Sequence, residues 1–218
     1  MQITDDVLKP TIDIFCETIA LELSQFRKFI PKSPKTATNS ALTGGFVEEL
    51  VKEFIRKWIG HRRYLTGTLF SGSFSGYPPK QIDGIVYDPT AGPLILNKGD
   101  FAIIHPAFCS QVIEVKTSCS NFPDFRKRLS DISRTYMGHR TAAHVMGIII
   151  SDSDPKQKTE IVGTNGFIQS LYDFTTVGHC PVCILFKEVD GDYEPYEPAI
   201  RAMISNIYDK QYKLERYF

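Results

Sequence analysis

Apolar residues recur along the chain with two different periods, one typical of helices and the other of strands. Residues 3–30 carry apolar side chains three or four positions apart, as on the buried face of one helix, which we expect to end before Pro31. After a polar connector over 31–43, the same spacing begins again at Thr43 and continues to Gly60. Further helices are predicted over 122–140, 156–172 and 200–217.

From residue 64 onward, apolar residues alternate with polar ones or gather in short runs, which are the two patterns of strands. Glycine, proline and aspartate residues separate these runs. The runs predict strands over 64–76, 81–87, 94–96, 101–105, 111–117, 145–150 and 181–189. The order of the elements predicts a mixed α/β sandwich, with helices on both faces of a mixed sheet.

Composition and charge limit the class of protein. With 218 residues, of which 42% are hydrophobic and 23% charged, the chain is long enough for one globular domain with a substantial core. The 25 basic and 25 acidic residues cancel, so contact with a polyanion would depend on local basic patches. We expect a single domain over 1–218, with an N-terminal helical extension over about 1–40, a core over about 41–190 and a C-terminal helix over about 198–218.

The N-terminus and the cysteines bear on location. The chain has no basic start followed by an apolar run and a cleavage site, and no apolar stretch approaches membrane-spanning length, so we expect a cytoplasmic protein without a membrane partner. The five cysteines include one close pair, Cys180 and Cys183. We interpret this pair as strand residues rather than as half of a zinc site, which usually needs four ligands.

The candidate chemistry lies on two apolar strands, of which one carries Asp83 and the other carries Glu114 and Lys116. Glu114 and Lys116 share a face, because side chains on a strand repeat with period two. Asp83, Glu114 and the carbonyl of Val115 supply oxygen ligands of the kind that Mg²⁺ prefers. Lys116 is then placed to orient an attacking water or to stabilise charge on phosphorus. The alternative is a structural carboxylate–lysine pair, although two acids against one lysine favour a cation.

These residues carry a resemblance to a known family. Ile82-Asp83 followed by Ile113-Glu114-Val115-Lys116 resembles the signature of the PD-(D/E)XK nuclease superfamily, although Pro79 precedes the aspartate by four residues and the literal Pro-Asp pair is absent. Together with Gly45-Phe46-Val47-Glu48-Glu49-Leu50, the pattern is similar to a bacterial branch associated with phage defence and restriction. The resemblance covers about 45–150 and implies a restriction-endonuclease-like, three-layer α/β/α sandwich with a central mixed sheet.

The resemblance also implies roles for particular residues. Asp83, Glu114 and Lys116 correspond to the catalytic positions, with Asp83, Glu114 and Val115 as metal ligands and Mg²⁺, replaceable by Mn²⁺, as the cofactor. A glutamate of the second helix completes the implied site, and the spacing from the glycines indicates Glu49. Helical geometry instead places Glu48 on a flank of the apolar stripe and Glu49 almost opposite the stripe. We predict Glu49, with Glu48 as the alternative.

Substrate contacts are predicted on the strand of Asp83 and on the basic helix after the motif. Gln81 shares the strand face of Asp83, although a solvent-facing glutamine is an equal alternative. The helix also carries Lys127 and Arg128, and its basic residues are candidates for phosphate contacts, for which a solvated basic face is the alternative. Among them we predict Arg126, Arg134 and Arg140 as substrate ligands. His139 is the histidine closest to this set.

Together, the motif and its resemblance predict a metal-dependent endonuclease that hydrolyses phosphodiester bonds of DNA in restriction or phage defence. The expected partner is double-stranded DNA, bound by a homodimer or by a subunit of a defence complex. One alternative is a non-catalytic nucleic-acid-binding or assembly module with a nuclease-like fold. Another is an unrelated α/β protein whose acids form structural pairs.

Overall fold

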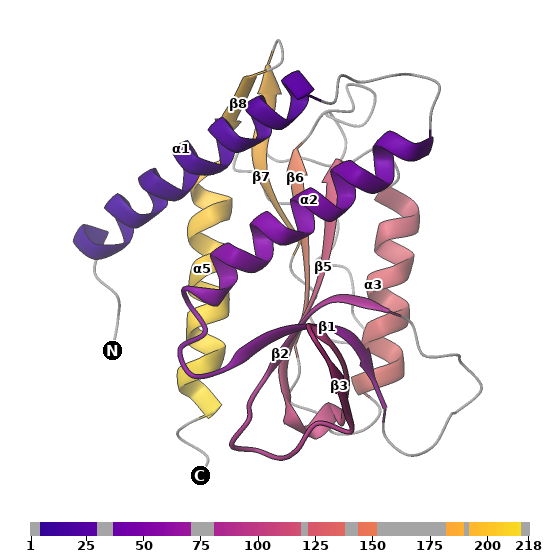
Figure 1. Cartoon of the computed structure of the whole chain (residues 1–218). Coiled ribbons are helices and arrows are strands. Elements are labelled where there is room, and N and C mark those ends of the chain that lie inside the picture. The colour runs from indigo at the N-terminus through magenta and orange to yellow at the C-terminus, as the bar shows by residue number, and fades with distance from the viewer. Residues whose placement is uncertain are drawn as a thin grey trace.

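A mixed sheet organises the part of the chain that the computed structural model describes, which comprises residues 5–29, 37–70, 81–118, 122–137, 144–151, 182–189 and 192–214 (Figure 1). Within these ranges the eight strands run in the order β3-β4-β1-β2-β5-β6-β7-β8. The strands are β1 (Arg63–Leu69), β2 (Ile82–Tyr87), β3 (Leu96–Lys98), β4 (Phe101–Ile104), β5 (Cys109–Ser118), β6 (His144–Ser151), β7 (Val182–Val189) and β8 (Asp192–Pro195). The helices are α1 (Asp5–Phe29), α2 (Ala37–Arg56), α3 (Phe122–Met137) and α5 (Glu197–Leu214), with a short 3₁₀ turn over Pro106–Phe108.

The pairing of neighbouring strands changes from antiparallel to parallel at β5, in the middle of the sheet. β2 is antiparallel to both of its neighbours, β1 and β5, whereas β5, β6 and β7 are parallel. Parallel neighbours need a crossover connection, and α3 lies between β5 and β6 in the sequence. The strand that carries Glu114 and Lys116 therefore leads directly into the basic helix.

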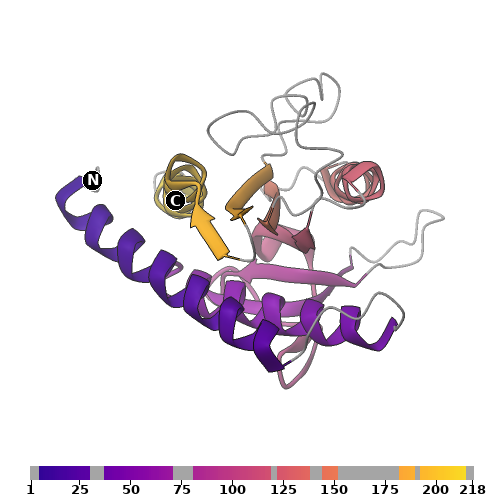
Figure 2. The ribbon, with the colours of Figure 1, turned by 90° about the horizontal axis from the view of Figure 1, so that it is seen from above.

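The helices cover both faces of the sheet. Buried side chains of α1, α2 and α5 form one cluster with one face of the sheet, and those of α3 form a second cluster with the other face. Seen from above, α1 and α2 lie on the side of the sheet opposite α3 (Figure 2). The chain is thus an α/β/α sandwich with a central mixed sheet, which confirms the predicted fold class.

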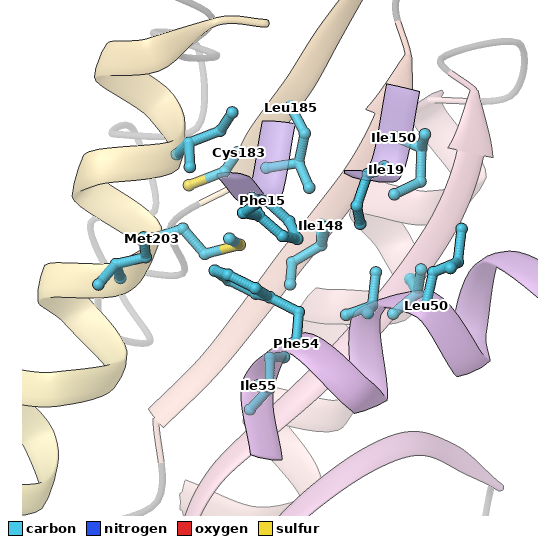
Figure 3. Packing of buried hydrophobic residues seen from close by; sticks show 14 of the residues in the cluster. Phe15, Ile19, Leu50, Phe54, Ile55, Ile148, Ile150, Cys183, Leu185 and Met203 are labelled. Atoms are coloured by element: carbon cyan, nitrogen blue, oxygen red, sulfur yellow. The ribbon is translucent and has the colours of Figure 1, made fainter. Parts of the chain in front are cut away.

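The larger cluster joins the N-terminal helix to the rest of the core. The rings of Phe15 in α1 and Phe54 in α2 stack with centroids 3.4 Å apart. Figure 3 shows these rings between Met203 of α5 and Ile148 of β6, with Cys183 of β7 above them. Burying aromatic side chains in this way contributes strongly to stability, because each ring removes a large apolar area from water.

The main departures from the predicted elements occur where burial does not dictate the pattern. α2 begins at Ala37, within the predicted polar connector, and residues 42–46, which precede the buried Val47, are exposed or half-buried. β8 was not predicted, because Asp192–Pro195 is a polar edge strand that pairs only with β7. Cys183 lies buried in β7, as predicted, whereas Cys180 and the predicted helix over 156–172 lie outside the described residues. Among the described helices, none combines the length and the hydropathy needed to cross a membrane.

Candidate active site

The two motif strands separate next to Asp83. In the pairing of β2 with β5, Gly84 lies opposite Ile113. At the next position of β2, the Asp83 side chain, rather than its backbone, accepts a hydrogen bond from β5. The Val115 amide donates a hydrogen bond to Asp83 Oδ2 at 2.9 Å. The Thr66 hydroxyl, in β1, donates to the Asp83 carbonyl at 3.1 Å. Backbone and side chain of Asp83 are thus both fixed at the strand end.

The Thr66 contact coincides with an irregularity of β1. The register between β1 and β2 shifts between Leu65 and Gly67, the two neighbours of Thr66. Gly67 has a φ of 157° and lies so close to β4 that an added Cβ would come 1.8 Å from the Ala102 carbonyl oxygen. Bulges of this kind commonly redirect a strand next to a functional site.

The buried Glu114 of β5 forms an ion pair with the half-exposed Arg128 of α3. The Glu114 side chain is 1% exposed, and Arg128 donates to both of its oxygens, with Nη2 3.1 Å from Oε1. The same Nη2 donates to the Gln81 carbonyl at 2.7 Å and lies 4.0 Å from Asp83 Oδ1. One guanidinium therefore faces both motif carboxylates.

Burial raises the pKa of each carboxyl group in this cluster. Burial, followed by repulsion from Asp83, raises the pKa of Glu114 to about 7 despite the ion pair with Arg128. The pKa of Asp83 is also raised by burial, against the Val115 hydrogen bond and the charges of Arg128 and Lys116. The cluster therefore holds more negative charge than its surroundings stabilise, a condition that a bound cation relieves.

Of the two candidate glutamates, Glu48 lies within reach of the charges of this cluster, whereas Glu49 pairs within α2. Glu48 is half-buried, and its pKa is raised by burial and by Asp83 and lowered by Lys116 and Arg128. The Glu49 side chain is 60% exposed and pairs with Lys52 at 2.7 Å. Consecutive residues of a helix point about 100° apart, which agrees with a half-buried Glu48 on the flank of the apolar stripe and an exposed Glu49 beyond it. We therefore replace Glu49 with Glu48 in the site proposed below.

The remaining motif residues lie as follows. Val115 is buried, and Lys116 is exposed beside it at the outer end of β5. Gln81 is exposed just before β2, and its backbone carbonyl accepts the hydrogen bond from Arg128. Arg126 is exposed on α3. Arg134 belongs to the same helix, and Arg140 and His139 lie outside the described residues.

The sequence indicated Arg128 only as one of the basic residues available for phosphate contacts, and it did not predict the ion pair of Arg128 with Glu114 or the approach of Tyr64 to Gly84. Arg128 follows Phe125 by three residues and precedes Leu129, so it borders the apolar stripe of α3 and can reach the sheet. Tyr64 is buried, and an added Cβ at Gly84 would lie 2.0 Å from its hydroxyl oxygen. A glycine inside a strand often marks such a close approach, and this was the available signal. Burial, with the charges of nearby carboxylates, raises the pKa of the Tyr64 hydroxyl.

Gly147 brings α3 close to the site. It lies opposite Glu114 in the parallel register of β5 and β6. An added Cβ there would meet Leu129 and Phe125 of α3 at 2.9 and 3.0 Å. The missing side chain thus lets α3 approach the sheet at the point where Arg128 reaches Glu114.

The donor set fits a hard divalent cation. Within the described ranges no three histidine, cysteine or acidic side chains gather around one point, so Asp83 and Glu114 form a two-carboxylate set. Mg²⁺ is commonly held by one or two carboxylates, with water and substrate phosphate filling the other positions. The residues present therefore suit Mg²⁺ better than a metal that needs a complete protein cage.

Fold and sheet topology place the chain among restriction-endonuclease-like α/β/α proteins. Its structural neighbours include NucC of E. coli MS115-1 in the cAAA-bound form, with a TM-score of 0.62 and 16% identity over 97% of this chain and 92% of that one. NucC of P. aeruginosa ATCC27853, also cAAA-bound, matches with a TM-score of 0.62 and 14% identity over 96% and 93%. No family model and no curated protein sequence matches. At these identities the likeness establishes the fold.

Proposed function

We propose that the protein is a Mg²⁺-dependent endonuclease of the PD-(D/E)XK type that hydrolyses phosphodiester bonds of DNA. One observation carries the proposal: the Asp83 and Glu114 carboxylates converge on one guanidinium at the strand end where Lys116 emerges. The restriction-endonuclease-like fold supports it. The resemblance of the motif to that superfamily gives the reaction class, because a fold alone does not define chemistry.

Each residue has a role in this proposal. Asp83, Glu114 and the Val115 carbonyl hold the cation, which on binding supplies Lewis-acid activation of the phosphate and lowers the pKa of a bound water. The Val115 hydrogen bond fixes the Asp83 carboxylate. Lys116, exposed beside this carboxylate, orients the attacking water and offsets charge on the phosphate. Glu48, near both residues, positions a second water.

Double-stranded DNA is the proposed substrate, bound along the exposed side of α3. Arg126 and Arg134 of this helix, with Arg140 beyond it, supply the phosphate contacts. Because acidic and basic residues cancel over the whole chain, one copy offers little general attraction for DNA. We therefore propose that a homodimer, or a subunit in a defence complex, forms the complete DNA-binding surface.

Plasmid cleavage tests the proposal. Wild-type protein is incubated with supercoiled DNA and Mg²⁺ or Mn²⁺, with and without cAAA, the ligand named for both NucC structures. Asp83→Ala and Lys116→Ala are each expected to lower the cleavage rate by about 100-fold or more. The matched controls are Asp192→Ala and Lys98→Ala, which change exposed residues of β8 and β3, the two edge strands.

Two results would count against catalysis at this site. Cleavage that survives both site substitutions would show that the chemistry lies elsewhere. DNA binding without cleavage, with each metal and with cAAA, would favour the alternative of a non-catalytic nucleic-acid-binding module.

A further inference from the structure

Arg128 takes the place that a cation shared by Asp83 and Glu114 would take. Its guanidinium donates to both oxygens of Glu114, and its Nη2 lies 4.0 Å from Asp83 Oδ1. A third acceptor, the Gln81 carbonyl, holds the same nitrogen at 2.7 Å. The guanidinium thus supplies positive charge and hydrogen bonds where the carboxylates would otherwise repel one another.

Exposure indicates which member of this cluster can move. The Glu114 side chain is 1% exposed and the Asp83 side chain 15%, whereas that of Arg128 is 35% exposed. Both carboxylates lie on central strands, while Arg128 extends from the helix above them by a long flexible stem. The arginine is therefore the group that can leave toward solvent without disturbing the sheet.

A divalent cation and this guanidinium cannot share Glu114. Both Glu114 oxygens already accept hydrogen bonds from Arg128, and two positive groups a few ångströms apart repel strongly away from bulk water. Resting on the function proposed above, we infer that Arg128 is an exchangeable counter-ion, which the divalent cation displaces and which then binds a phosphate of the DNA.

The chemistry of arginine suits both of its proposed partners, the Glu114 carboxylate and a phosphate of the DNA. Its planar fork of donors matches a carboxylate and a phosphate equally well, so the side chain can pass from Glu114 to the substrate. DNA that draws Arg128 away frees the cation site, and a cation that occupies the site frees Arg128 for DNA. Cation and DNA therefore strengthen one another's binding by the same factor.

Titration calorimetry of the metal-free protein with Mn²⁺ tests the inference. If Arg128 covers the site about nine-tenths of the time, its removal tightens the apparent Kd for Mn²⁺ about tenfold. We expect this gain in Arg128→Gln, together with a larger rise in Tm on adding Mn²⁺ than the wild type shows. Arg63→Gln, a change of an exposed arginine opposite Tyr87 on the β1–β2 ladder, is the matched control and should bind Mn²⁺ like the wild type.

A second measurement follows the coupling to DNA. In a Lys116→Ala background, which prevents cleavage, a short duplex should tighten Mn²⁺ binding more when Arg128 is present than when it is Gln. If Arg128→Gln does not fold, as judged by circular dichroism, Arg128→Lys replaces it in both experiments. A lysine ammonium lacks the planar fork that pairs with both Glu114 oxygens but keeps the positive charge, so a smaller gain in Mn²⁺ affinity is expected.

The outcomes separate this inference from the proposed function. Equal or weaker Mn²⁺ binding by the Arg128 variants, in a protein whose wild type binds Mn²⁺ and cleaves DNA, overturns the exchange and leaves the nuclease proposal intact. Absence of Mn²⁺ binding to wild type and variants alike overturns the metal site, and the exchange with it. Tighter Mn²⁺ binding by the variants, with reduced coupling to DNA, supports the exchange.

Discussion

Replacing Glu114 with glutamine removes the most deeply buried charge of the candidate site while keeping nearly the same shape. Burial is the main cause that raises the pKa of Glu114 from its ordinary value of 4.5 to about 7. Because the folded state binds this proton more tightly than the unfolded chain does, Glu114 contributes stability below about pH 4.5. That contribution is lost as the pH rises toward 7.

The size of the effect follows from the rise in pKa. The difference between about 7 and 4.5 is about 2.5 pH units. At 1.36 kcal/mol per unit, the free energy of unfolding of the wild type should fall by about 3 kcal/mol between pH 4.5 and pH 8 through this group alone. Glutamine cannot ionise, so Glu114→Gln should gain about this amount relative to the wild type over the same range.

Urea unfolding in EDTA, at several pH values from 4.5 to 8, measures this difference. Groups that titrate alike in both proteins cancel when the two free energies are subtracted. Glu53→Gln, which removes a carboxylate at an exposed position of α2, is the matched control. A difference between Glu114→Gln and wild type that stays constant with pH would refute the reasoning, because it would mean that Glu114 ionises in the fold as easily as in the unfolded chain.

Three further predictions follow from the geometry. Glu48→Gln should lower the rate of Mg²⁺-dependent cleavage roughly tenfold or more. Glu49→Gln should keep the cleavage rate and lower the free energy of unfolding in urea by at most about 0.5 kcal/mol. If instead Glu49→Gln lowers the cleavage rate and Glu48→Gln does not, Glu49 belongs to the site. Gly84→Ala forces a methyl group to within 2.0 Å of the Tyr64 hydroxyl and should lower the free energy of unfolding by about 1–3 kcal/mol or more, so an unchanged urea midpoint would contradict this packing. Mg²⁺ at about 100 times its Kd should stabilise the wild type by about 2.7 kcal/mol and Asp83→Ala much less, and equal rises in Tm for both proteins would place the cation elsewhere.

Most of the fold follows from the sequence where one face of an element is buried. The period of α1 and the apolar runs of β5 and β6 are local properties, so their positions were predicted to within a few residues. The pattern weakens where an element is exposed, as over residues 42–46 of α2 and in the edge strand β8, and there the predicted bounds were wrong or the element was missed. Periodicity reports burial, and an exposed turn of helix needs none.

For the candidate site, too, the sequence predicted the features that depend on local pattern and missed those that depend on packing between elements. Strand alternation and the motif predicted that Asp83 and Glu114 belong together, and the structure holds both against one guanidinium. The choice between Glu48 and Glu49 depends on how α2 is rotated against the sheet, which local spacing does not determine. The contact of Arg128 with Glu114 depends on the height of α3 above the sheet, a property of packing between elements.

A substitution at Gly147 would change the height of α3 above the sheet. A methyl group added there meets α3 at 2.9 Å, so α3 or its side chains must yield by a few tenths of an ångström. The three atoms nearest to the added group belong to Leu129, Val182 and Phe125, and a shift of α3 away from this group would move Arg128 relative to Glu114. If the proposed exchange at Glu114 takes place, a substitution at Gly147 would therefore change the Mg²⁺ concentration at which the cation displaces Arg128, without changing any proposed ligand.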